Sequence, residues 1–552
     1  MGHTEKRYAV GLDFGTLSGR CVLVDCRTGE EVAESVLNYR HGVMDGILPD
    51  GQKLPPQYAL QHPADYIEVL QKTIPDVLRK AGADPQEVAG MGIDFTACTL
   101  LPVDREGTPL CIRPEWAHEK HAYVKLWKHH AAQEQADRIN ALAQERGEEW
   151  IAVYGGKLSS EWALPKILQV LEESPDVYAA TDRFTEAGDW LSRVLTGEET
   201  HSAVFAGYKA CWSAETGYPS NAFLKALDPR LDGLAGTKLS EAVSGTDRIA
   251  GRLNAHGAAV TGLPLGTPLA LPMIDAHAAM PALGITGDRT LMMIIGTSGC
   301  YIVNDRTGKP VPGICGYVKD GVIPGLYTYE AGQSGVGDIF DWFVKNCVPA
   351  SYRAEADEKG IGVHQLLREK VKGQKPGESG LLALDWLNGN RSVLNNAELS
   401  GVVLGLTLAT RPEEIYRAWI EAVAYGTRAI LETFEENGVP IDRIVAAGGI
   451  AVKDEMMMQI LADVLNREIA IAGSTQAGAF GSAMYGAVAG GVFGSITEAA
   501  EHLARPALRT CVPDATRHAV YNRLYAEYKR LHDYFGRGEN RVLLNLREIR
   551  VN

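Results

Sequence analysis

Two turns that combine glycine with hydroxyl side chains carry the clearest chemistry in the sequence. At the first, Asp13 comes just before the turn, Thr16 and Ser18 lie in it, and Arg20 follows. Small side chains let backbone N–H groups approach phosphate oxygens, and the hydroxyls add donors. A carboxylate beside hydroxyls and an arginine also suits a magnesium–phosphate pair, because Mg²⁺ keeps most of its water ligands. The other interpretation is that glycine only supplies positive φ in a tight hairpin.

The second turn, Gly296-Thr297-Ser298-Gly299, repeats the first at a distance of about half of the 552-residue chain. Each turn lies between two apolar stretches typical of strands, and each second stretch ends near an Asp-x-x-Thr-Gly motif. The matching turn chemistry indicates an internal duplication. Two such hairpins facing each other would hold one polyphosphate from opposite sides.

The rest of the chain reads as helices and strands in two α/β halves of similar plan. We place the boundary near 284–288, which gives domains 1–286 and 287–552. Strands are expected at 31–37, 88–95, 313–319 and 443–447, and helices at 64–80, 410–437, 455–465, 478–489 and 517–535. The long helix should begin at a capping box, with Thr410 as the cap and Glu413 as its partner.

The composition excludes several classes of protein. Hydrophobic residues make up 45% and charged residues 22%, as in globular proteins, and the length predicts two or more domains. A net charge of −15 disfavours nucleic acid and anionic membranes as partners. Nine scattered cysteines without a CxxC pair fit reduced thiols, and the N-terminus lacks an apolar signal stretch, so we expect a cytoplasmic protein. The charge-free stretch 469–497 is rich in small residues, which favours a buried helix over a membrane span.

The paired hairpins and the later Ala446-Ala447-Gly448-Gly449 turn resemble those of the actin-like ATPases, and the chain has neither a P-loop nor a dinucleotide-binding glycine motif. Within that fold, the chain from about Tyr8 to Gly494 is similar to the FGGY carbohydrate kinases. The resemblance implies an α/β fold of two duplicated actin-like ATPase (ribonuclease H-like) domains with the catalytic cleft between them. It also implies ATP as co-substrate and Mg²⁺ as the metal.

Five longer segments resemble the substrate-facing stretches of family members that phosphorylate L-ribulose. They are 92–104, 121–132, 206–212, 272–279 and 329–343. They imply phosphorylation of O5 of L-ribulose in L-arabinose catabolism, with ribitol, D-ribulose and L-xylulose as alternative substrates. Glycerol is disfavoured, because glycerol kinases carry Asn-Gln-Arg-Glu where this chain has Asp-Phe-Thr-Ala at 94–97. An actin-like nucleotide switch and a sugar-binding regulator remain more remote alternatives.

The resemblance also implies roles for individual residues. Asp275 would be the catalytic base, although an aspartate there also suits a helix N-cap, and Asp13 would organise the metal. The sugar would contact Ala97, Lys209, Asp275 and Glu330. The nucleotide would contact Thr16, Ser18, Arg20, Gly296, Thr297, Ser298, Gly337, Asp341, Gly448, Gly449 and Lys453. For Asp341 and Lys453, ordinary turn and cap geometry explains the residue type equally well. The partners expected are the sugar, ATP and a second copy of the chain in a homodimer.

Two further groups of residues have structural interpretations. Four histidines, at 118, 121, 129 and 130, lack the accompanying ligands of a metal site and predict a polar helix face, from which some could reach the sugar. Four tryptophans, at 116, 127, 162 and 190, are expected in the core.

Overall fold

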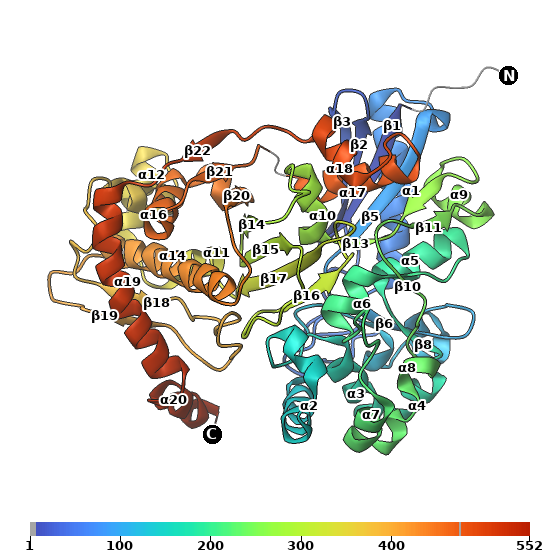
Figure 1. Cartoon of the computed structure of the whole chain (residues 1–552), viewed down its shortest axis with the longest axis horizontal. Coiled ribbons are helices and arrows are strands. Elements are labelled where there is room, and N and C mark those ends of the chain that lie inside the picture. Colours follow the sequence, from blue (N-terminus) through green and yellow to red (C-terminus); the bar gives the residue numbers. More distant parts are fainter. Residues whose placement is uncertain (1–6, 474–475, 552) are drawn as a thin grey trace.

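The computed structural model describes residues 7–473 and 476–551, and in it the chain forms two α/β bodies (Figure 1). Each body is built on a seven-stranded sheet with its own apolar core. The first sheet contains β1 (Tyr8–Phe14), β2 (Ser18–Asp25), β3 (Glu31–Asn38), β5 (Val88–Phe95), β11 (Ile249–Arg252), β12 (Pro268–Ala270) and β13 (Met273–Ile274). The second contains β14 (Thr290–Ile295), β15 (Gly299–Asp305), β16 (Gly316–Lys319), β17 (Tyr327–Gln333), β20 (Arg443–Ala447), β21 (Ile469–Ile471) and β22 (Arg509–Cys511).

The two sheets repeat one pattern of strand pairing, as the duplicated hairpins predict. β1 pairs antiparallel with β2 and parallel with β5, and β14 pairs antiparallel with β15 and parallel with β20. In both hairpins the turn is closed by one backbone hydrogen bond of 3.0 Å, from Gly15 to Ser18 and from Gly296 to Ser298. The two candidate phosphate turns therefore occupy equivalent places in the two bodies.

One predicted strand takes a different place from the one the repeat suggests. In the first sheet β3 lies directly beside β2, but in the second the strand beside β15 is β17, and β16 lies outside it at the edge. The strand expected at 313–319 thus exists, with bounds Gly316–Lys319, but it does not pair with the second strand of its hairpin. The neighbour in a sheet is chosen by long-range pairing, which the local sequence pattern does not encode.

Helices surround the two sheets and a smaller third sheet in the first body. The third sheet has β4 (Leu60–Gln61), β6 (Leu100–Val103), β7 (Val124–Lys125) and β8 (Arg183–Glu186), and the short pairs are β9 (His201–Ser202) with β10 (Val243–Ser244) and β18 (Leu382–Leu384) with β19 (Val402–Leu404). The helices up to the middle of the chain are α1 (Pro63–Ala81), α2 (Gln133–Arg146), α3 (Ala163–Glu173), α4 (Pro175–Ala180), α5 (Ala187–Thr196), α6 (Ala203–Lys209), α7 (Asn221–Leu227), α8 (Leu234–Thr237), α9 (Ala255–Thr261) and α10 (Asp275–Ala282). Those that follow are α11 (Gly337–Asn346), α12 (Ala350–Lys359), α13 (Val363–Lys370), α14 (Pro412–Glu436), α15 (Gly449–Lys453), α16 (Glu455–Leu465), α17 (Ala477–Ala489), α18 (Ile496–Leu503), α19 (Ala515–Gly536) and α20 (Val542–Val551).

The five helices expected at 64–80, 410–437, 455–465, 478–489 and 517–535 are present, and the cap of one of them is displaced. α14 begins one residue later than predicted: its cap is Arg411, whose N–H donates to Glu414, so the Thr410–Glu413 box is wrong. The segment around the four histidines is not a helix face, because a 3₁₀ turn, β7 and a loop precede α2. Of the four tryptophans, Trp162 and Trp190 are buried, whereas Trp116 and Trp127 are half-buried.

Helix α17 returns the chain from the second body to the first. It follows β21 of the second sheet, but Figure 1 shows it with α18 beside the strands of the first sheet. Glycines on both sides allow very close packing: a Cβ on Gly11 would overlap the carbonyl oxygen of Ala479, and one on Gly92 that of Ser482. A Cβ on Gly486 would in turn lie 2.7 Å from the carbonyl carbon of Met91.

The structure thus confirms a buried helix in the charge-free stretch. None of the described helices has the length and apolar character that crossing a bilayer needs. The predicted boundary at 286/287 remains a prediction, but the packing places 477–503 with the first body.

Candidate active site

Three aspartates meet at the point where the two bodies join. Asp13 and Asp94 are register partners at the ends of β1 and β5, and β13, which leads into Asp275, pairs with the end of β5. Gly478, in the first turn of α17, lies against all three. A Cβ there would be 3.4 Å from the backbone oxygen of Asp275 and 3.8 Å from a carboxylate oxygen of both Asp13 and Asp94. Gly478 therefore lies beside the Asp13 and Asp94 carboxylates and the backbone of Asp275.

Burial and mutual repulsion set the charge of this group. Burial raises the pKa of Asp13, and burial together with the neighbouring Asp13 raises the pKa of Asp94. The Ser482 hydroxyl donates to Asp94 Oδ2 at 2.6 Å, which offsets part of that rise. For Asp275, burial and the charge of Asp13 raise the pKa to about 7, against a 2.6 Å hydrogen bond from the N–H of Ala276. Asp275 is the first residue of α10, and the N-cap position belongs to Ile274.

A buried ion pair between the two bodies lies near Asp275. Lys209, at the end of α6, places Nζ 3.3 Å from Oε1 of Glu330 on β17. Both side chains are almost fully buried, and Lys209 also lies 4.8 Å from the centre of the Trp162 ring. Although burial opposes ionisation, the Lys209 charge lowers the pKa of Glu330. These are unusual places for charged groups, because a buried charge is costly unless it is paired.

The turn that contains Ala97 is held by buried charged side chains. Lys166 Nζ donates to the carbonyl oxygens of Cys98 and Leu126, at 2.7 and 3.0 Å. On the other side, the N–H of Thr99 donates to Glu186 at 2.8 Å. The backbone beside Ala97 is thus fixed, which suits a surface of small residues against which a ligand packs.

Several polar residues beside these were not predicted from the sequence. Asp94 belongs to the carboxylate group. His277 lies 3.6 Å from Glu330, and Arg391 lies between Glu330 and Glu161, at 3.4 and 3.8 Å. His130, one of the four histidines noted in the sequence, donates its Nε2–H to Glu161 Oε1 at 3.1 Å. A charged residue within the Asn388-Gly-Asn-Arg391 loop was the available sequence signal for Arg391.

Side chains from other parts of the first body hold the first phosphate turn in place. The indole Nε1 of Trp127 donates to Thr16 Oγ1 at 3.1 Å, and Gln61 donates to the carbonyl oxygen of Thr16 at 2.8 Å. Ser18 is half-buried at the start of β2. Arg20 is the register partner of Asp13, but its guanidinium lies 3.7 Å from Glu34 on β3.

The second turn meets two other predicted nucleotide residues. The N–H of Gly337, at the start of α11, donates to the carbonyl oxygen of Gly296 at 3.0 Å. Gly448, with φ of 97°, packs its Cα against the carbonyl oxygen of Ile295, just before that turn. Gly296 and Gly449 have no such reason to be glycine, because a Cβ on either would meet nothing within 4 Å and neither has a positive φ.

Thr297 and Ser298 complete the turn, and Thr297 is exposed. Asp341 and Lys453 belong to α11 and α15, whose first residues lie beside this turn. The Asp341 side chain is 78% exposed and forms an ion pair with His364 at 3.2 Å, and Lys453 is exposed at the end of α15. Their positions therefore fit ordinary surface residues as well as nucleotide contacts.

The described residues form neither a ready-made metal site nor a disulfide. In residues 7–473 and 476–551, no group of three or more His, Cys, Asp or Glu side chains is arranged to hold a metal ion alone. The four histidines accordingly form no cluster: His121 and His129 are buried and His130 is half-buried, while His118 is exposed. All nine cysteines have free thiols.

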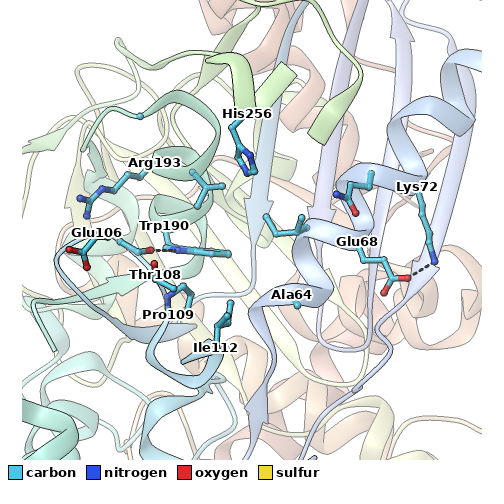
Figure 2. A pocket seen from close by; sticks show the side chains of 15 residues that line it. Ala64, Glu68, Lys72, Glu106, Thr108, Pro109, Ile112, Trp190, Arg193 and His256 are labelled. Carbon is cyan, nitrogen blue, oxygen red and sulfur yellow. Dashed lines mark hydrogen bonds and ion pairs between the residues drawn. The ribbon is translucent and has the colours of Figure 1, made fainter. Parts of the chain in front are cut away.

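One cavity of the first body is separate from this region. It has a volume of about 900 Å³ and lies between α1, the 106–112 loop, α5 and α9 of the first body (Figure 2). Figure 2 shows the Glu68–Lys72 pair on one wall and Arg193 and Trp190 on the other. None of the predicted site residues lines it.

Family models decide what kind of protein carries this site. The N-terminal domain of the FGGY family of carbohydrate kinases matches residues 8–282, and the C-terminal domain matches residues 291–490. The chain belongs to the FGGY family of carbohydrate kinases. ATP is therefore its co-substrate, and the chain has the family's two-domain actin-like ATPase fold.

Individual relatives agree with this assignment. The chain is 51% identical over 539 residues to a ribulokinase from Bacillus licheniformis, covering 97% of this chain and 98% of the relative. It is 50% identical to a ribulokinase from Geobacillus thermodenitrificans, with 98% and 97% coverage. Among solved structures, xylulose kinase from Rhodospirillum rubrum superposes with a TM-score of 0.80 at 23% identity, covering 95% and 98% of the chains. That similarity concerns the fold.

Proposed function

We propose that this FGGY kinase transfers the γ-phosphoryl group of ATP to O5 of L-ribulose, and so acts in L-arabinose catabolism. The observation that carries the proposal is the position of Asp275 near Asp13 and the buried Lys209–Glu330 pair, in a chain about 50% identical to ribulokinases. Lys209 and Glu330 offer a donor and an acceptor to a polyhydroxyl substrate, and Ala97 offers a small surface.

Asp275 acts as the base in this proposal. Its carboxylate accepts a hydrogen bond from the attacking hydroxyl and takes its proton as the new O–P bond forms. In the loose transition state of phosphoryl transfer that proton leaves late, so a carboxylate suffices to orient and accept. A pKa of about 7 keeps a large fraction of Asp275 ionised at neutral pH.

The phosphate chain of ATP lies between the two turns in this proposal. Backbone N–H groups and hydroxyls of Thr16, Ser18, Thr297 and Ser298 face it, and Arg20 adds charge at the first turn. The open space at Gly296 and Gly449 supports a nucleotide there, because neither packing nor backbone conformation requires glycine at those positions. Gly337 and Gly448 shape the adenosine side, with Asp341 and Lys453 at its edge.

Magnesium is the metal we propose, and the carboxylates fit it. The Asp13 and Asp94 carboxylates and the backbone oxygen of Asp275 lie around Gly478, and Asp94 Oδ1 is buried without a hydrogen-bond partner among the described residues. Asp13 would hold the ion through water, which suits a site without three direct protein ligands. The bound ion would neutralise charge on the phosphates, and EDTA would abolish turnover.

Location and assembly complete the proposal. We infer a cytoplasmic enzyme, since nine free thiols fit a reducing compartment. We also propose a homodimer. Light scattering coupled to size-exclusion chromatography would test it.

A coupled ADP-release assay tests the function. Wild type and Asp275→Asn are compared with MgATP and L-ribulose, D-ribulose, ribitol, L-xylulose or glycerol. We expect turnover of L-ribulose that falls at least about 1,000-fold in Asp275→Asn, while ATP binding persists. Turnover of another polyol in preference would overturn the substrate. ATP hydrolysis without sugar that the substitution leaves intact would indicate a nucleotide switch. Asp288→Asn, at an exposed ion pair with Arg306, is the matched control.

A further inference from the structure

Arg391 belongs to a loop of the second body, residues 385–398, that reaches the first body. Asn395 of this loop donates to the carbonyl oxygen of Lys157 at 2.9 Å. The Arg391 guanidinium lies 3.8 Å from Oε2 of Glu161 in the first body and 3.4 Å from Oε1 of Glu330 in the second. Arg391 therefore stands where both bodies meet the Lys209–Glu330 pair.

The polar groups around Arg391 are close together but poorly paired. The pairs of Glu330 with Lys209, Arg391 and His277 measure 3.3, 3.4 and 3.6 Å, whereas the buried Arg417–Glu421 pair elsewhere measures 2.9 Å. In the described part of the chain, Arg391 Nε and both ring nitrogens of His277 are buried without a hydrogen-bond partner. Since buried donors are nearly always satisfied, this cluster has spare donors for a ligand with several oxygens.

Glu330 connects the reacting end of the site, at Asp275, with Arg391. Its charge acts on Asp275, and its carboxylate also pairs with Arg391. A linear sugar whose reacting hydroxyl lies at Asp275, and whose chain passes Lys209 and Glu330, brings its far end to Arg391.

We propose that Arg391 is a specificity-determining residue that donates hydrogen bonds to the C1–C2 end of the ketose, opposite the hydroxyl that is phosphorylated. The inference rests on the proposed function. It identifies a residue that recognises the end of the substrate opposite O5. A guanidinium has only donors and a keto oxygen only accepts, so the two match without reorientation. Glu161 is a positioning residue in this arrangement, because it pairs with the guanidinium through one oxygen and with His130 through the other.

The test compares L-ribulose with two analogues that differ only at this end. 1-Deoxy-L-ribulose lacks O1, and ribitol carries a hydroxyl in place of the C2 carbonyl. The kcat/KM of each is measured for wild type, Arg391→Met, Arg391→Lys and Glu161→Gln. Arg517→Met, which removes an arginine–aspartate pair with Asp463 far from the site, is the matched control.

We expect Arg391→Met to lower kcat/KM for L-ribulose by roughly 10- to 100-fold, mainly through KM, and to reduce the preference over at least one analogue by about tenfold. Arg391→Lys keeps the charge but loses the planar fork, so its effect should be intermediate. Glu161→Gln should change the preference in the same direction, and Arg517→Met should leave it unchanged.

Two results overturn the inference in different ways. If every substrate loses the same factor in Arg391→Met, the residue only ties the two bodies together and reads no part of the sugar. If the wild type does not phosphorylate L-ribulose, the proposed function fails and the inference fails with it. Because the first result requires an active wild type and the second an inactive one, the two failures are distinguishable.

Discussion

Lys209 and Glu330 form a buried ion pair across the two bodies, with Nζ 3.3 Å from Oε1. Lys209 comes from α6 of the first body and Glu330 from β17 of the second, so the pair exists only when the bodies are together. Beside it, the Tyr208 hydroxyl of the first body donates to the carbonyl oxygen of Thr328 in the second, and within the first body Tyr154 donates to the carbonyl oxygen of Gly207 at 2.5 Å. The floor of the candidate sugar site is thus also a contact between the bodies.

Removing one partner of this pair should cost more than removing both. We expect Lys209→Met and Glu330→Gln each to lower the melting temperature by about 5 °C, because each leaves a buried charge without its main partner. The double substitution should cost clearly less than the sum, since neither charge remains. Differential scanning calorimetry of the four proteins measures the coupling. Purely additive shifts would show that the pair contributes no interaction of its own.

Gly449→Ala should weaken nucleotide binding without harming the fold. A Cβ there meets nothing within 4 Å, so the methyl group projects into the space that we assign to ATP. We expect the KM for ATP to rise about tenfold, with an unchanged melting temperature and sugar KM. Gly362→Ala, equally open but before α13, is the control and should behave as wild type. An unaltered KM for ATP in Gly449→Ala would place the nucleotide elsewhere.

Gly92→Ala should destabilise the protein strongly, because its Cβ would overlap the carbonyl oxygen of Ser482 on α17. Backbone cannot yield as a side chain can, so we expect a loss of about 3 kcal/mol or more in the free energy of unfolding. Melting followed by intrinsic fluorescence measures it. Gly236→Ala, where a Cβ has free space, should be neutral or slightly stabilising. Equal melting temperatures for the two variants would contradict the close packing of α17.

The His201 ion pairs predict a pH-dependent contribution to stability. His201 lies 3.3 Å from Asp189 and 3.6 Å from Glu199. Burial opposes its charge, but the two carboxylates prevail and raise its pKa to about 9 from 6.5. Because the pKa is raised in the folded state, the charge on His201 stabilises the protein fully below pH 6.5. The contribution falls progressively up to pH 9 and is lost above it.

At pH 6 this contribution amounts to at most about 3 kcal/mol. His201→Gln should therefore melt lower than wild type at pH 6, with a gap that closes by pH 10. The exposed His256→Gln serves as control. A gap that does not change with pH would mean that His201 is not charged in the folded protein.

The parts of the fold that the sequence predicted are those that local patterns encode. The bounds of β5 and α16 follow from apolar runs and periodicity, and the paired hairpins follow from their turn residues. The position of β17 beside β15 depends on pairing between segments distant in the chain, and the return of α17 to the first sheet depends on glycines that match across it.

The site divides in the same way. Residues within a recognisable motif, such as Asp275 and Glu330, could be named from the sequence. Arg391 and Glu161 could not, because each lies in a loop or turn without a motif, and only the fold brings the two within 3.8 Å. The environment of His129 was also unforeseen: its contact with Gln169, at 2.9 Å, buries a ring that the sequence suggested would face solvent.

The return of α17 has a consequence for dividing the gene. A fragment that ends at residue 286 would contain all seven strands of the first sheet but expose Gly11, Gly90 and Gly92, whose bare backbone α17 covers. The complementary fragment would carry α17 with no surface to receive it. We therefore expect neither fragment to fold alone, and a split version of this kinase would need its break elsewhere, such as the exposed loop at 405–409.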